Sequence, residues 1–96
     1  MKTKKEAELP KWFTNHRLSP TIYTQGAEVE NPFSGACYTL TANELSLYDY
    51  IIGLQFVIDR HGGVFNPKTR EYQKDMARGL SWFRTHNAEA YMVLLD

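Results

Sequence analysis

The most strongly apolar part of the chain has the periodicity of an α-helix. Between residues 42 and 60 the apolar side chains form two stripes with helical spacing. One stripe contains Leu47, Ile51, Leu54 and Ile58, and the other contains Leu45, Tyr48, Ile52 and Phe56. Thr41 and Glu44 have the spacing of a capping box, and Gly62-Gly63 favours a left-handed helix end. The pattern predicts a helix over residues 42–60 that is apolar on most sides.

Two more helices are predicted after it. Asn66-Pro67 is a favoured helix start. A single apolar face follows, formed by Tyr72, Met76, Leu80 and Phe83, and it predicts a helix over residues 67–85. Asn87 is placed to cap a last helix over residues 88–95, which is too short to be stable alone and must pack on the other two.

The first part of the chain has turn signals and short extended runs in place of helical spacing. Gln25-Gly26 predicts a hairpin turn between residues 21–24 and 27–30, and the Asn31–Gly35 segment predicts a second turn before residues 36–40. The fold class is therefore α+β: a small antiparallel β-meander of two or three strands over residues 21–40, followed by a three-helix body.

The chain length predicts a single domain over residues 1–96. Residues 1–10 are expected to form a mobile basic tail, with Trp12 and Phe13 anchoring the following segment to the body. One cysteine cannot form an internal disulfide, and neither a secretion signal nor an apolar run of about 18 residues is present. We therefore expect a soluble, cytoplasmic protein.

Charge weighs against non-specific nucleic-acid binding, because the 11 basic and 11 acidic residues give a net charge of zero. Residues 1–17, however, carry five basic residues against two acidic ones, a balance of +3. Nucleic-acid binding is therefore kept as the alternative function. Its candidate residues are Lys4, Lys5, Lys11, Arg78, Trp82 and Arg84, with Trp82 expected to be exposed for base stacking.

Candidate chemical groups are dispersed along the chain. Cys37 is expected to be a structural strand residue, because no base lies near it in sequence, and Ser34 lacks the Gly-x-Ser-x-Gly pattern of a nucleophile elbow. The histidines show no metal-ligand spacing, and those that end predicted helices, His61 and His86, are expected to cap them. We expect no enzymatic activity, no metal and no cofactor.

The carboxylates of the first helix are also interpreted structurally. Asp49 and Asp59 lie ten positions apart, or about 15 Å along a helix, which is too far for a paired acid–base site. Asp49 lies between two tyrosines in an apolar helix. A buried ion pair of Asp49 with Arg78 or Arg84 is therefore expected.

The apolar excess of residues 42–60 is the main functional signal. A domain with two other helices and a thin sheet cannot cover both stripes, so we expect a homodimer, with contact to a different protein as the alternative occupant of the same surface. The candidate interface residues are Leu47, Tyr50, Ile51, Gly53, Leu54 and Ile58. The resulting hypothesis is a small, non-enzymatic accessory protein that acts by self-association and by binding another protein.

Two segments carry a resemblance to known sequences. They read ENPFSGACYTLTANELSLYDYIIG, beginning at Glu30, and GLSWFRTHNAEAYMVLLD, ending at Asp96. In these segments the chain resembles small uncharacterised proteins encoded by tailed bacteriophages, including marine ones. The resemblance implies a viral or environmental origin and no activity. The interaction hypothesis then includes a host protein as a possible partner.

Overall fold

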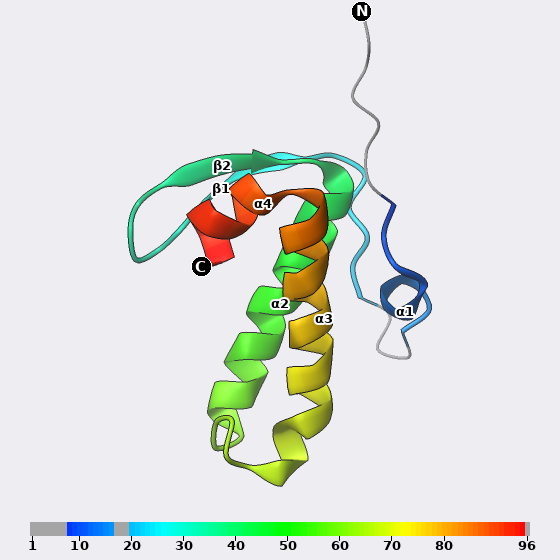
Figure 1. Ribbon diagram of the computed structural model, residues 1–96, viewed down its shortest axis with the longest axis vertical. Helices are drawn as coiled ribbons and strands as arrows, with labels where there is room; N and C mark the ends of the chain where they lie inside the picture. Colours follow the sequence, from blue (N-terminus) through cyan, green and yellow to red (C-terminus); the bar gives the residue numbers. More distant parts are fainter. Residues whose placement is uncertain (1–7, 17–19, 96) are drawn as a thin grey trace, which may run out of the picture.

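The computed structural model describes residues 8–16 and 20–95. Eight elements follow one another along the chain (Figure 1). They are α1 (Lys11–Thr14), β1 (Ala27–Glu30), β2 (Cys37–Leu40), α2 (Ala42–Arg60), the 3-10 helix η1 (Pro67–Thr69), α3 (Arg70–His86), α4 (Ala88–Ala90) and the π-helical turn η2 (Tyr91–Leu95). The predicted α+β class is confirmed.

Helix α2 has the predicted bounds because both of its ends are fixed by the chain itself. The Thr41 hydroxyl accepts from the Glu44 backbone at 3.3 Å, and the Glu44 carboxylate accepts from the Thr41 backbone at 2.9 Å. At the other end, Gly62 and Gly63 have positive φ, and Gly63 donates to the Ile58 carbonyl at 2.8 Å. This bond satisfies one of the last carbonyls of the helix.

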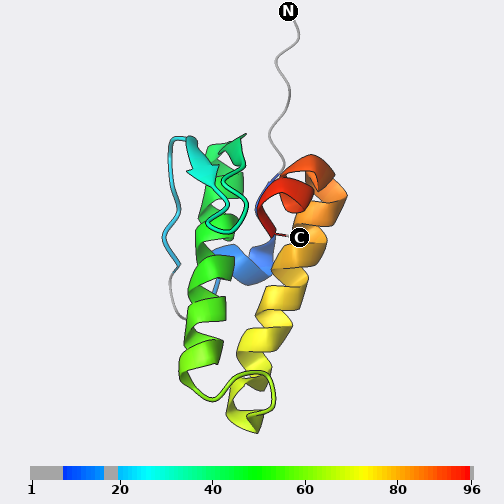
Figure 2. The same cartoon turned by 90° about the vertical axis from the view of Figure 1, so that its left-hand side faces the viewer.

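Helices α2 and α3 lie side by side and antiparallel, and they form the long axis of the fold (Figures 1 and 2). Gly79 of α3 is buried, and a Cβ atom there would lie 2.8 Å from two side-chain atoms of Ile51. The missing side chain therefore allows the two helices to approach closely. The buried core cluster comprises Phe13, Leu40, Leu47, Ile51, Trp82, Phe83, Ala90 and Leu94.

The sheet is a two-stranded antiparallel hairpin that lies across one end of the helix pair (Figure 1). Its register pairs Ala27 with Leu40 and Glu30 with Cys37, so the turn falls between residues 31 and 36. The predicted strand over residues 21–24 is not formed. Tyr23 donates its backbone N–H to Ser46 of α2 at 2.8 Å, which holds this segment against the helix instead of against a strand.

Gly26 serves a different purpose from the predicted hairpin turn. A Cβ atom at this position would lie 2.1 Å from the Leu40 carbonyl oxygen. The glycine therefore permits a close backbone approach at the base of the hairpin. The predicted turn at this glycine is wrong, although the backbone does require a residue without a side chain here.

The segment before the hairpin packs on the opposite side of the helix pair from the hairpin turn (Figures 1 and 2). Phe13 of α1 is fully buried, as predicted for an anchor. The predicted mobile tail falls partly on residues 1–7, which lie outside the described residues. Residues 8–10, in contrast, are held in place: Trp82 donates its indole N–H to the Glu8 carbonyl at 3.2 Å, and Leu9 packs against the core.

Asn87 connects three elements at the end where the hairpin lies. Its side-chain oxygen accepts from the Ala90 backbone at 3.1 Å, which confirms the predicted cap of the last helix, and from the Tyr38 hydroxyl at 3.2 Å. Its amide donates to the Glu44 carboxylate at 2.8 Å. The short C-terminal helix is thereby fixed to both β2 and α2, and Leu94 enters the core.

Candidate protein-interaction site

The structure corrects which stripe of α2 is available to a partner. Leu47, Ile51, Leu54 and Ile58, which were predicted as interface residues, are buried within the single chain. They face the interior because α3 packs against this side of the helix. The stripe that stays accessible is the other one: Ile52 is 39% exposed and Phe56 is 65% exposed.

The two remaining predicted interface residues lie elsewhere. Tyr50 and Gly53 line a hollow of about 320 Å³, together with Pro20, Thr21 and Tyr72. The Tyr50 hydroxyl is part of a hydrogen-bond network described below. Gly53 is exposed, and a Cβ atom there would meet no atom within 4 Å, so no close helix contact explains this glycine.

An apolar groove runs between α2 and α3, and of the accessible stripe it includes Tyr48 and Ile52. It consists of two hollows of about 310 and 300 Å³, which share Gln55, Met76 and Leu80 as a common middle. We call this surface the α2–α3 groove. The hollow of about 310 Å³ lies at the hairpin end, and its other lining residues include Phe33, Ile52, Leu94 and Leu95. The hollow of about 300 Å³ lies at the end of the loop between α2 and α3, and its other lining residues include Ile58, Val64, Gln73 and Ala77.

The hairpin turn holds Phe33 at the edge of the groove. The Asn31 side-chain oxygen accepts from the backbone of Phe33 at 2.8 Å and of Ser34 at 3.4 Å, and the Asn31 amide donates to the Val93 carbonyl at 3.0 Å. The turn is thus fixed both internally and to the C-terminal segment. Phe33 nevertheless is 96% exposed. A rigid turn therefore presents a bare aromatic ring to the solvent.

A second turn of the same type lies at the other end of the groove. Asn66 accepts from the Lys68 backbone at 3.0 Å, and the buried Thr69 hydroxyl donates to the Gly63 or Asn66 carbonyl. Between the glycines and Asn66, Val64 is 61% exposed and Phe65 is 94% exposed. Two asparagine-anchored turns, each carrying an exposed phenylalanine, therefore bracket the groove.

The groove is nearly uncharged. Asp59 is the one charged side chain among the described residues that line its two hollows. The remaining polar lining consists of the amides of Asn31, Gln55 and Gln73 and the Tyr48 hydroxyl. An apolar surface with a few polar groups suits a polypeptide partner that buries hydrophobic side chains.

The residues predicted to contact nucleic acid do not form one open surface. Trp82 is buried at 8% exposure and donates to the Glu8 carbonyl, which corrects its predicted role as an exposed stacking ring. The guanidinium groups of Arg78 and Arg84 lie over the rings of Trp12 and Tyr91, at 5.7 and 5.1 Å. Lys11 is exposed, and Lys4 and Lys5 lie outside the described residues. Nucleic-acid binding stays a prediction.

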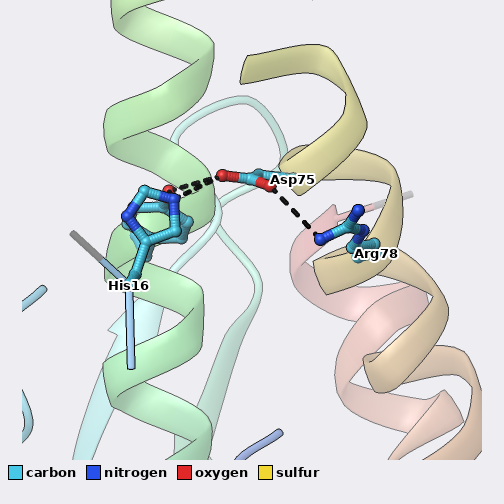
Figure 3. A network of polar contacts seen from close by, with 4 residues as sticks. His16, Asp75 and Arg78 are labelled. Atoms are coloured by element: carbon cyan, nitrogen blue, oxygen red, sulfur yellow. Dashed lines mark hydrogen bonds and ion pairs between the residues drawn. The ribbon is translucent and has the colours of Figure 1, made fainter. Parts of the chain in front are cut away.

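A polar network joins the N-terminal segment to both long helices. His16 Nε2 lies 2.8 Å from Asp75 Oδ2, and the Tyr50 hydroxyl donates to the same carboxylate oxygen at 2.9 Å. Arg78 approaches the other oxygen of Asp75 at 3.8 Å (Figure 3). Burial raises the pKa of the Tyr50 phenol, and the hydrogen bond and negative charge of Asp75 raise this pKa further.

The acid that contacts Arg78 is therefore Asp75, which is partly buried, and the predicted pair of Asp49 with Arg78 or Arg84 is corrected. Asp49 is exposed on α2. Its negative charge is the chief cause that raises the pKa of the Tyr23 phenol. Asp75, like the predicted Asp49, is a carboxylate that needs polar partners because it is partly removed from water. It lies on α3, which is less apolar than α2, so the sequence pattern gave no reason to expect its burial.

The candidate nucleophiles are placed as surface groups. Cys37 lies in β2, as predicted, and is exposed; partial desolvation, followed by the charges of Glu28 and Glu30, raises the pKa of its thiol. The Ser34 hydroxyl accepts from the Ala36 backbone at 3.2 Å within the turn. His61 is the C-cap of α2, so the length of this helix, about 28 Å, separates it from the hairpin.

No protein-family model, no curated protein and no solved structure was found to match the chain. Across residues 8–16 and 20–95, His, Cys, Asp and Glu side chains nowhere form a group of three or more that could hold a metal ion. In the same part of the chain, every helix is too short or too polar to cross a bilayer.

Proposed function

We propose that this protein is a non-enzymatic interaction protein that associates with other polypeptides, its own copies included, through the α2–α3 groove. The observation that carries this proposal is the exposure of Phe33 at the edge of an apolar hollow. Aromatic side chains at the centre of an interface commonly provide most of its binding energy. A rigid turn reduces the conformational entropy that is lost when such a side chain is buried.

The exposed apolar area supports the same proposal. Phe33, which lines the hairpin-end hollow, exposes on the order of 200 Å² of aromatic surface, given its exposed fraction of 96%. Ile52 and Val64 add to this area along the same groove. Contiguous apolar patches of a few hundred Å² on small proteins commonly mark interaction sites.

The binding mode that fits the groove is the insertion of an amphipathic helix. Two antiparallel helices form its walls, and both hollows are lined mainly by aliphatic side chains. Partners of this class present hydrophobic residues at spacings of three and four. Peptide display against the immobilised chain therefore tests the proposal directly, because a library contains many sequences with this spacing.

We expect the selected peptides to show this spacing and to lose binding to the Ile52→Arg variant, which places a charge on the groove wall. Ile22→Arg is the matched control, because Ile22 is 46% exposed and does not line either hollow. Peptides that bind both variants equally, or a selection that yields no binder, would contradict the proposed function.

A further inference from the structure

We propose that a second copy of the chain occupies the α2–α3 groove, packed antiparallel about a two-fold axis, with Phe33 of each copy seated in the loop-end hollow of the other. This inference rests on the proposed function and specifies its first partner. It concerns the arrangement of the two chains, which the groove alone does not determine.

The groove has the self-complementarity that a two-fold interface requires. In such an interface the same surface must contain both the protruding and the receiving part. Phe33 protrudes at the hairpin end, and the loop-end hollow, lined by Ile58 and Val64, is the receiving part. A two-fold axis through the shared middle, at Gln55 and Met76, exchanges the two ends of the groove.

The positions along α2 agree with this exchange. The hairpin-end hollow contacts α2 from Tyr48 to Gln55, and the loop-end hollow contacts it from Gln55 to Asp59. Each hollow therefore lies within about two helical turns of the proposed axis. Phe33 of one copy then falls at the level of the other copy's last α2 turn, beside Val64.

Charge favours the antiparallel over the parallel arrangement. Asp59 is the charged residue of the described groove lining, and it lies at the loop end. A parallel pair would place the two Asp59 carboxylates at the same end of an apolar interface, where like charges repel. The antiparallel pair keeps them at opposite ends. The net charge of zero adds no overall repulsion between copies.

The exposed apolar side chains of the groove supply part of the area that a stable pair buries. A standard interface buries about 800 Å² on each partner. Phe33 alone supplies on the order of 200 Å² on each chain. Ile52, Val64 and the half-buried Met76 and Leu80 line the same surface and extend this area.

Light scattering across a dilution series is the first experiment. We expect the wild-type chain to have the mass of a dimer and to dissociate on dilution, and Phe33→Glu to raise the dissociation constant at least about tenfold. Ile22→Glu replaces an apolar residue outside the groove that is 46% exposed, and this variant is expected to dimerise like the wild type. Circular dichroism verifies that both variants are folded, as expected for exposed positions.

Mixed cysteine cross-linking is the second experiment, and it tests the direction of packing. In a Cys37→Ser background, the Phe33→Cys chain is mixed with the Val64→Cys chain and oxidised. We expect a cross-linked heterodimer in high yield, and little product from Phe33→Cys alone or from Ile22→Cys mixed with Val64→Cys. Cross-linking of Phe33→Cys with itself at equal yield would overturn the antiparallel arrangement.

The outcomes separate this inference from the proposed function. A chain that is monomeric at every concentration, or a dimer insensitive to Phe33→Glu, overturns the inference. If peptides selected by display still require an intact Ile52 in that case, the groove remains an interaction site and the proposed function stands. If display also yields no peptide whose binding requires an intact Ile52, both the dimer inference and the proposed function are rejected.

Discussion

His16 and Asp75 are 59 positions apart in the sequence, and their side chains meet at 2.8 Å between Nε2 and Oδ2. Both side chains are largely buried, at 16% and 14% exposure. The same carboxylate oxygen accepts from Tyr50 of α2. This relationship attaches the segment before the hairpin to both long helices at one point.

Replacing His16 by alanine is expected to lower the free energy of unfolding by about 1–3 kcal/mol, because a partly buried carboxylate loses one of its donors. The larger effect should be local, with faster amide hydrogen exchange in residues 8–16 than in α2 or α3. Urea denaturation and hydrogen exchange measure the two effects. His61→Ala, at an exposed position, is the control, and equal exchange rates in both variants would refute the attachment.

The raised pKa of Tyr50 predicts a loss of stability in alkaline solution. Above the ordinary phenol pKa of about 10, the unfolded chain releases the Tyr50 proton while the folded chain retains it. The contribution of the neutral Tyr50 phenol to the free energy of unfolding is thus fully present below this pH, and the free energy of unfolding falls as the pH rises above it. Denaturation midpoints measured on both sides of this pH should decline less steeply with rising pH for Tyr50→Phe than for the wild type.

Phenolate absorbance gives an independent check of the same residue. Tyr50 should ionise only above the ordinary pH range of a phenol. Asp75→Asn should make it ionise at lower pH, because the variant removes the negative charge beside the phenol. An unchanged titration curve in Asp75→Asn would mean that Asp75 does not influence Tyr50.

The two helix glycines should respond in opposite directions to alanine. Gly53→Ala is expected to stabilise the protein by up to about 1 kcal/mol through helix propensity, because the added methyl group meets no atom within 4 Å. Gly79→Ala is expected to destabilise it by about 1 kcal/mol or more through overpacking, since the methyl group would lie 2.8 Å from Ile51. Thermal unfolding of the two variants, each the other's control, tests this difference.

Cys37 should react slowly with alkylating reagents at neutral pH although it is exposed. Desolvation and the Glu28 and Glu30 charges raise the pKa of its thiol, so little of the reactive thiolate forms. Glu30→Gln, at the position paired with Cys37 in the hairpin, should increase the alkylation rate a few-fold. Glu71→Gln, at the start of α3, should leave the rate unchanged.

The parts of the fold that sequence could predict are those specified by local chemistry. The bounds of α2 follow from Thr41 and Glu44 at one end and two glycines at the other, all within a few residues of the helix itself. Asn66 and Asn87 likewise mark the starts of the next helices. Such capping bonds depend on neighbours in sequence, so a single sequence contains the information.

The choice between the two stripes of α2 could not be made in the same way. Both stripes are apolar and have the same period, and in the structure Gly79 of α3 lies against Ile51 and Leu47 of one stripe. Tertiary packing therefore buried Leu47 and Ile51 and left Ile52 and Phe56 accessible. A glycine in the middle of the predicted second helix was the available signal, since it marks a possible close contact.

The α1 segment and the His16–Asp75 pair were also beyond sequence analysis. Four helical residues after Pro10 have no periodicity to detect, and their position depends on contacts with residues about 60 to 75 positions away. The same is true of Trp82, whose burial depends on the chain at Glu8. Long-range partners of this kind leave no pattern in the local sequence.

The bond between Trp82 and Glu8 spans 74 positions, so it constrains how the chain folds during synthesis. Residues 8–16 leave the ribosome before the two long helices, yet the surface that receives them is complete only after α3 has emerged. The α2–α3 hairpin, whose contacts are closer in sequence, can form before this docking step. Residues 8–16 consequently reach their final position after the helix pair that receives them, and Phe13 stays open to chaperones until α3 has been synthesised.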